Sequence, residues 1–163
     1  PDTPLIDGLN DSKKLSAARR ETIAARIANV ALAIGMAFIE PAEIDEIGMS
    51  AALKKAMKIA IEQTGVDPDC VLIDGNPVHV HPREKTIVKG DAKIASIAAA
   101  SIVAKVSRDA LMVDYDAQYP AYHFAQNKGY ASADHIKAIA EYGLTPIHRT
   151  TFCGNFAKGP RLF

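Results

Sequence analysis

The stretch Val71-Leu72-Ile73-Asp74-Gly75-Asn76 decides the fold of this chain, and Val88-Lys89-Gly90-Asp91 repeats its pattern further along. In both, apolar residues that favour a buried strand are followed within a few positions by an aspartate. Ligands bind outside the carboxyl ends of the strands in open α/β sheets. Asp74 and Asp91 are therefore candidates to share a divalent metal ion.

Both aspartates also have a purely structural interpretation. Asp74-Gly75-Asn76 is typical turn chemistry, and Asp91 is placed to cap a helix that begins at Ala92. On spacing alone, turns and caps are the more common reason for such residues.

Strand and helix patterns alternate along the rest of the chain. Ser16 has the chemistry of a helix N-cap, and Ile23, Ile27 and Val30 follow at helical spacing. Pro41 disfavours helix at the residue before it, so the apolar run that precedes it is predicted to be a strand. Helices are predicted over residues 16–33, 50–63, 92–114 and 132–141, and strands over 33–40, 70–74 and 86–88. This order predicts an α/β layered domain.

The composition excludes several classes of protein. The 163 residues, 48% of them hydrophobic, suffice for one domain, and no apolar run reaches the roughly 18 to 20 residues of a membrane span. Two cysteines, Cys70 and Cys153, have neither zinc-site spacing nor the density of a disulfide scaffold. Basic and acidic residues number 19 each, so any nucleic-acid surface must be local. We expect a soluble, cytoplasmic protein without a membrane partner.

Five further blocks stand in a definite order: LNDSKKLS (9–16), EID (43–45), AAASIVAKVSRD (98–109), QNKGY (126–130) and HRTTF (148–152). Together with the two aspartate stretches they closely resemble bacterial ribonuclease HII, the type 2 ribonuclease H family. The likeness runs from about Leu5 to Phe156.

The resemblance implies a ribonuclease H-like fold, a mixed β-sheet flanked by helices. It also implies a single catalytic domain over residues 1–163, with a C-terminal helical part and tail from about residue 115. The implied activity is that of an endoribonuclease, a monomer, which cleaves the RNA strand of RNA/DNA hybrids and nicks duplex DNA 5′ of an embedded ribonucleotide. Its cofactors are two divalent cations, Mg²⁺ or Mn²⁺, held by four carboxylates, of which Asp74 and Asp91 are two.

The family's other two carboxylates belong to an Asp-Glu pair followed by Gly-Arg-Gly, a block that this sequence does not contain. We therefore expect a family member that is incomplete at its N-terminus, lacks the first strands of the fold and is inactive by itself. The alternative is a nucleic-acid-binding fragment of that enzyme without catalysis.

Tyr130 is a candidate substrate contact. A phenol can stack on a sugar or base and hydrogen-bond the 2′-hydroxyl that distinguishes RNA from DNA. The resemblance aligns Tyr130 with the tyrosine that senses the ribonucleotide, and the alternative is a core-edge tyrosine after a glycine turn.

Basic and polar residues are further candidates for contacts to the nucleic-acid backbone. Ser12 and Lys13 open the first helical region, where N–H groups and a lysine charge can hold a phosphate, or form a plain cap. Lys128, His148 and Arg149 are weaker candidates, and each could equally be an ordinary surface residue. His79 and His81 could hold zinc, but without a third ligand nearby a surface connection is more common.

Overall fold

The structure, a computed structural model, describes residues 6–157. The chain forms two compact units, and the part that the structure describes divides into a first unit of residues 6–37 and 54–107 and a second unit of residues 38–53 and 108–157. Two helices, α3 (Met49–Gln63) and α4 (Ala95–Gln118), continue from one unit into the other. That the chain forms a single catalytic domain stays a prediction.

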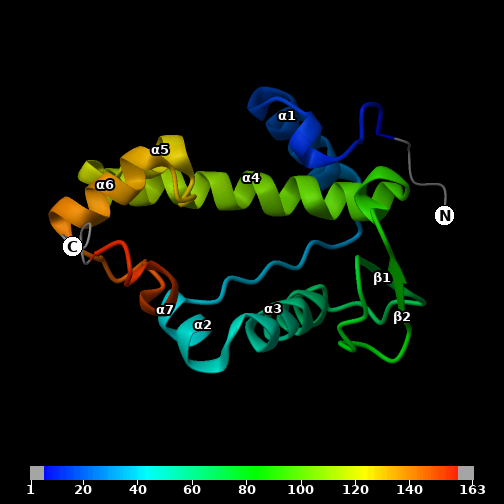
Figure 1. Cartoon of the computed structure of the whole chain (residues 1–163). Helices are drawn as coiled ribbons and strands as arrows, with labels where there is room; N and C mark the ends of the chain where they lie inside the picture. Colours follow the sequence, from blue (N-terminus) through cyan, green and yellow to red (C-terminus); the bar gives the residue numbers. More distant parts are fainter. Residues whose placement is uncertain (1–5, 158–163) are drawn as a thin grey trace. The chain divides into compact units, whose positions relative to one another are not determined.

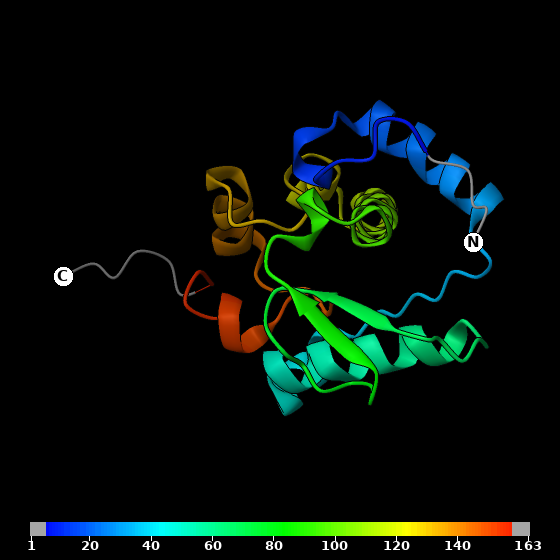
Figure 2. The ribbon, with the colours of Figure 1, turned by 90° about the vertical axis from the view of Figure 1, so that its right-hand side faces the viewer.

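The first unit contains a pair of parallel strands, β1 (Val71–Asp74) and β2 (Glu84–Ile87), which Figure 2 shows side by side. Their register pairs Val71 with Glu84 and Asp74 with Ile87. The predicted strand at 70–74 is confirmed, and the second strand begins two residues earlier than predicted. The resemblance implied a mixed sheet; within the described residues the sheet consists of this parallel pair.

The connection between the two strands, residues 75–83, is held by a carboxylate and contains no helix. Oε1 of Glu84 accepts hydrogen bonds from the N–H groups of Val78 and His79, and Oε2 accepts one from Val80. These bonds favour the ionised form, so the pKa of Glu84 lies below its ordinary value, the bond from Val80 having the largest effect. Parallel strands are usually joined by a crossover helix. Here the Glu84 carboxylate holds a connection without a helix in a compact form.

Helix α1 (Ala17–Val30) follows a 3-10 turn, η1 (Ser12–Lys14), and packs on the first half of α4 in the same unit (Figure 1). Ser16 caps α1 as predicted, its hydroxyl accepting a hydrogen bond from the Arg19 N–H. Ile23 and Ile27 are buried against Ile102 of α4, which is fully buried. The spacing of apolar residues correctly indicated this face of α1.

The strand predicted over residues 33–40 is wrong. This segment has no ladder partner among the described residues. Instead, the Met36 N–H donates to the side-chain oxygen of Gln63, and Gly35 lies so close to the Ala60 carbonyl that a Cβ would not fit. A segment whose residues favour an extended backbone becomes a β-strand only where another strand supplies hydrogen bonds. Glu40 is extended, as the residue before Pro41 must be, but Pro41 then opens a helix.

Helix α4 begins three residues later than predicted. Residues Gly90–Ala92 form a 3-10 turn, η2, so Asp91 does not cap a helix that starts at Ala92. Ile97, Ala98 and Ile102 of α4 are buried, and Ile102 packs on α1.

The second unit is helical. Its elements are α2 (Pro41–Ile47), the second half of α4, η3 (Pro120–Tyr122), α5 (Phe124–Asn127), α6 (Ala133–Tyr142) and α7 (Thr150–Cys153). Helix α6 is as predicted, with Ser132 as N-cap and Gly143 at a positive φ past its end. The short helices α2, α5 and α7 were not predicted. At the core, the rings of Tyr122 and Phe124 stack with centroids 5.6 Å apart.

No helix within residues 6–157 is long and apolar enough to cross a membrane.

Candidate active site

Asp74 ends strand β1, and the parallel pairing places the end of β2 at the same edge of the first unit. The ladder continues past Asp74, because the Gly75 N–H donates to the Ile87 carbonyl over 3.1 Å. One carboxylate oxygen of Asp74 accepts a hydrogen bond from the Gly90 N–H over 2.7 Å. Asp91 follows Gly90 directly, so the structure brings the two predicted aspartates to one edge.

Gly90 fits closely in this turn. It is buried, and a Cβ there would lie 2.6 Å from Cδ1 of Ile97 and 3.4 Å from Cβ of Ile87, so a larger residue would require the Ile97 side chain to shift. Lys89 precedes it in the left-handed region, with φ 55°. Backbone geometry therefore sets the position of Asp91 relative to β1, and leaves Asp74 exposed and Asp91 half-buried.

Two carboxylates at one edge are the oxygen donors that Mg²⁺ and Mn²⁺ prefer. The two carboxylates are therefore the type of ligand that a hard divalent cation prefers. Within residues 6–157 no group of three or more histidines, cysteines or acidic residues is placed to hold a metal ion.

Ser12 and Lys13, also in the first unit, differ in exposure. Ser12 is 5% exposed, and its hydroxyl shares a 2.8 Å hydrogen bond with the hydroxyl of Ser101 on α4. The Arg20 guanidinium donates to the Ser12 carbonyl over 3.0 Å. Lys13 is exposed, its N–H donating to the capping carboxylate of Asp11. Phosphate contacts by Ser12 and Lys13 stay predictions.

Tyr130 lies in the second unit at the end of a turn that Asn127 holds together. The Asn127 side chain donates to the Tyr122 carbonyl and accepts from the Gly129 N–H, and the Tyr130 N–H donates to the Asn127 carbonyl. Lys128 and Gly129 both have positive φ, 53° and 78°. This backbone presents the Tyr130 side chain, 70% exposed, at the surface.

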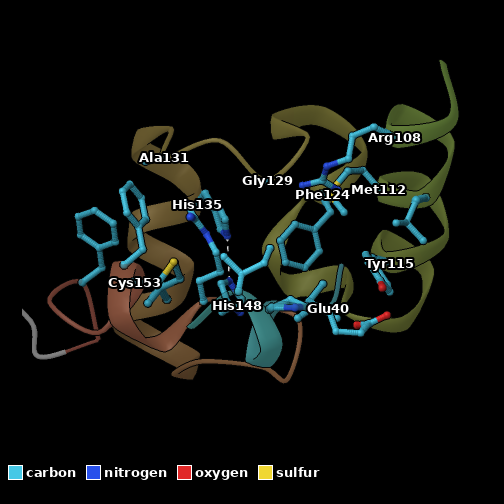
Figure 3. A pocket seen from close by; sticks show the side chains of 18 of the residues that line it. Glu40, Arg108, Met112, Tyr115, Phe124, Gly129, Ala131, His135, His148 and Cys153 are labelled. Atoms are coloured by element: carbon cyan, nitrogen blue, oxygen red, sulfur yellow. Dashed lines mark hydrogen bonds between the residues drawn. The ribbon is translucent and has the colours of Figure 1, made fainter. Parts of the chain in front are cut away.

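The Tyr130 carbonyl is tied to the core by two buried histidines. It accepts hydrogen bonds from the Ser132 N–H and from Nδ1 of His135, at 2.8 and 2.9 Å. Nε2 of His135 lies 3.0 Å from Nε2 of His148, the dashed line in Figure 3. His135 and His148 are 4% and 6% exposed. His148 was expected to contact nucleic acid; that stays a prediction, but both its ring nitrogens are already bonded within the protein.

A cavity of about 250 Å³ within the second unit is lined by both histidines and mainly by apolar side chains (Figure 3). Burial lowers the pKa of His148 below its ordinary value, and the neighbouring His135 lowers it further. Both effects favour the neutral form of His148.

Asp45 on α2 anchors the segment that carries His148 and Arg149. Its carboxylate accepts hydrogen bonds from the N–H and hydroxyl groups of Thr150 and Thr151, the first residues of α7. The bond from the Thr151 hydroxyl is the largest of the effects that hold the Asp45 pKa below its ordinary value. Arg149 lies over the ring of Phe152, 4.6 Å from its centroid.

Sequence reasoning missed the roles of Asn127, His135 and Asp45. The run Asn127-Lys128-Gly129 is typical of a left-handed turn and could have been found. The two histidines are 13 positions apart and Asp45 is 105 positions from Thr150, so those contacts have no local signal.

The comparisons with known proteins agree with this architecture. Residues 6–155 match the family model described as Ribonuclease HII. The chain belongs to the ribonuclease HII family. It is 49% identical to Ribonuclease HII of Enterococcus faecalis over 145 residues, 89% of this chain and 57% of that protein. It is 45% identical to Ribonuclease HII of Acetivibrio thermocellus over 157 residues, 96% of this chain and 61% of that protein.

The chain therefore spans about three-fifths of the length of those two ribonuclease HII relatives. For Ribonuclease HII of Geobacter metallireducens the identity is 49% over 150 residues, 91% of this chain and 70% of that protein. The crystal structure of the ribonuclease H2 from Pyrococcus horikoshii OT3 matches with a TM-score of 0.79 and 22% identity, over 93% of this chain and 83% of that chain. That match shows the ribonuclease H2-like α/β fold.

Proposed function

We propose that the protein, at its full length, is an endoribonuclease that cleaves the RNA strand of RNA/DNA hybrids and nicks duplex DNA 5′ of embedded ribonucleotides. The observation that carries the proposal is the hydrogen bond from Gly90 to Asp74, which gathers Asp74 and Asp91 at one edge of a chain that belongs to the ribonuclease HII family. The proposed enzyme is a cytoplasmic monomer that needs no membrane partner.

Asp74 and Asp91 are proposed to hold the divalent cations, Mg²⁺ or Mn²⁺, two in the complete site. When bound, such cations supply a nucleophilic water at neutral pH and stabilise the departing 3′ oxygen of the cleaved bond. The two carboxylates contribute the negative charge that retains the cations. The Gly90 N–H fixes one oxygen of Asp74, so that carboxylate keeps one orientation.

Substrate contacts are proposed for Tyr130, Ser12, Lys13, Lys128, His148 and Arg149. Tyr130 is suited to read the sugar, because its ring is exposed on a turn that hydrogen bonds of Asn127 and His135 hold in place. Lysine and arginine side chains would contact phosphates, which gives affinity without distinguishing RNA from DNA.

The test is to incubate the full-length protein and Mg²⁺ with duplex DNA that carries one ribonucleotide, and to analyse the ends of the products. A cut on the 5′ side of the ribonucleotide that leaves a 5′ phosphate and a 3′ hydroxyl is expected. Chelation of the metal should stop it. No cut, or a cut that leaves a cyclic phosphate, would contradict the proposal.

Nucleic-acid binding without catalysis is the second candidate. It is favoured by the small number of metal-ligating groups that residues 6–157 gather. The same assay separates the two candidates, because this one predicts retarded migration of the duplex without any cleavage.

A further inference from the structure

We propose that His135 is a positioning residue for discrimination of the ribonucleotide: with His148 behind it, it fixes the backbone of Tyr130 and so the place of the exposed ring. This rests on the proposed function, because Tyr130 is taken to read the sugar. Neither histidine has to touch the nucleic acid for this role.

The hydrogen bonds determine where the protons lie. The Tyr130 carbonyl can only accept, so Nδ1 of His135 carries a proton and donates. The Thr145 N–H can only donate, so Nδ1 of His148 has no proton and accepts. A neutral His148 then carries its proton on Nε2, which donates to the bare Nε2 of His135 over 3.0 Å.

The result is one directed chain of hydrogen bonds, from Thr145 through His148 and His135 to Tyr130. Every ring nitrogen in it has a partner. The Thr145 hydroxyl adds a second contact to Nδ1 of His148, at 2.8 Å. Because the rings are buried, breaking any link leaves a polar atom without water, and this cost makes the chain rigid.

The directed chain requires a neutral His148. A proton added to His148 would go to Nδ1 and face the Thr145 N–H, which can only donate. Burial lowers the pKa of His148 and so favours the neutral ring. Other titratable or charged groups at the same cavity or against the two rings are Glu40, Arg108, Tyr115, Tyr122, Arg149 and Cys153.

Two substitutions at one position separate the two bonds of His135. In His135→Asn the amide nitrogen takes the place of Nδ1, so it keeps the donor to Tyr130 and loses the bond to His148. In His135→Gln the amide reaches the place of Nε2, so it keeps the contact with His148 and loses the donor. A merely structural role would make both variants equally harmful, or make Gln the milder one.

The test measures cleavage of a single-ribonucleotide duplex, and binding of the same duplex, by the full-length protein and both variants. We expect His135→Gln to lower kcat by about threefold to tenfold, as for loss of one hydrogen bond, with KM unchanged. His135→Asn keeps the donor to Tyr130, so its kcat should stay within about twofold of the wild type, and the lost bond to His148 should lower only its thermal stability. Equal losses in both variants, or a larger loss in Asn, would overturn the proposal.

A spectroscopic measurement keeps the proposal testable if a variant does not fold, and it does not depend on the proposed activity. NMR of the wild-type protein labelled with ¹⁵N-histidine should show His135 as the Nδ1–H tautomer and His148 as the Nε2–H tautomer. Any other pair of states would overturn the proposal. Absence of cleavage by the wild type, with these tautomers found, would contradict the proposed function and leave the positioning of the Tyr130 backbone standing.

Discussion

Asp74 and Asp91 are held by backbone geometry, whereas Tyr130 is held by other side chains. At the strand edge, the parallel pairing and the close fit of Gly90 set the positions of Asp74 and Asp91. The Gly90 N–H also donates a hydrogen bond to the Asp74 carboxylate. At the turn, Asn127 and His135 supply the bonds that fix Tyr130. The difference indicates separate roles: the edge keeps charge in place, and the turn keeps an exposed ring in place.

The largest effect should come from removing the charge at the strand edge. We expect Asp74→Asn and Asp91→Asn, in the full-length protein, each to lower cleavage by about a thousandfold or more, because several kcal/mol of charge stabilisation is lost. Thermal unfolding should be little changed. Asp69→Asn, an exposed carboxylate just before the same strand, is the matched control and should cleave normally. A near wild-type rate for either variant at saturating Mg²⁺ would remove that residue from the site.

A smaller effect is expected when the backbone that holds the edge is crowded. In Gly90→Ala the new methyl would meet Cδ1 of Ile97, so we expect the free energy of unfolding to fall by about 1 to 3 kcal/mol. Displacement of Asp91 should slow cleavage by about tenfold to a hundredfold. Ile97→Val removes the opposing atom, and the double variant should recover part of both losses. Equal rates for the single and double variants would show that the fit of Gly90 does not matter.

Tyr130→Phe should show a weaker and more selective loss. Removing one neutral hydrogen bond is expected to cost about 0.5 to 1.5 kcal/mol, about threefold to tenfold in the rate on a single-ribonucleotide duplex. Binding should change less, because phosphate contacts supply most of the affinity. Tyr130→Ala should cost more, since the ring is also removed. Equal losses of rate and binding would return Tyr130 to a structural role.

The smallest effect should come from Asp45, which anchors α7 without touching Tyr130. Its pKa is lowered in the folded protein, so its stabilisation is present above the ordinary pKa of about 4 and is lost as pH falls through the lower folded value. We expect Asp45→Asn to lower the Tm by about 2 to 4 °C at neutral pH. The gap to the wild type should narrow as the pH is lowered below about 4. A Tm difference between the wild type and Asp45→Asn that does not change with pH would show that the ionised Asp45 carboxylate does not cause it.

Local patterns predicted the helices with clear caps and the two strand ends. Ser16 and Ser132 cap helices as expected, and the register of β1 and β2 brings Asp74 to the predicted edge. The strand at 33–40 was wrong because pairing is a property of two segments, and Gln63 and Ala60 are the neighbours that this segment found.

The family blocks gave the candidate residues but not the way in which they are held. His148 was predicted to contact the nucleic-acid backbone, yet its burial and its bond to His135 depend on contacts that no spacing encodes. The roles of Asp74 and Asp91 as metal ligands stay predictions, because the structure shows only that both residues lie at one edge of the strand pair.

Calorimetric measurement of Mn²⁺ binding to the full-length protein tests most directly whether Asp74 and Asp91 are metal ligands. We expect the wild type and Asp69→Asn to bind Mn²⁺ alike, and Asp74→Asn and Asp91→Asn each to bind it at least about tenfold more weakly, because an amide does not offset the charge of a divalent ion. Unchanged Mn²⁺ affinity in both variants would contradict the account.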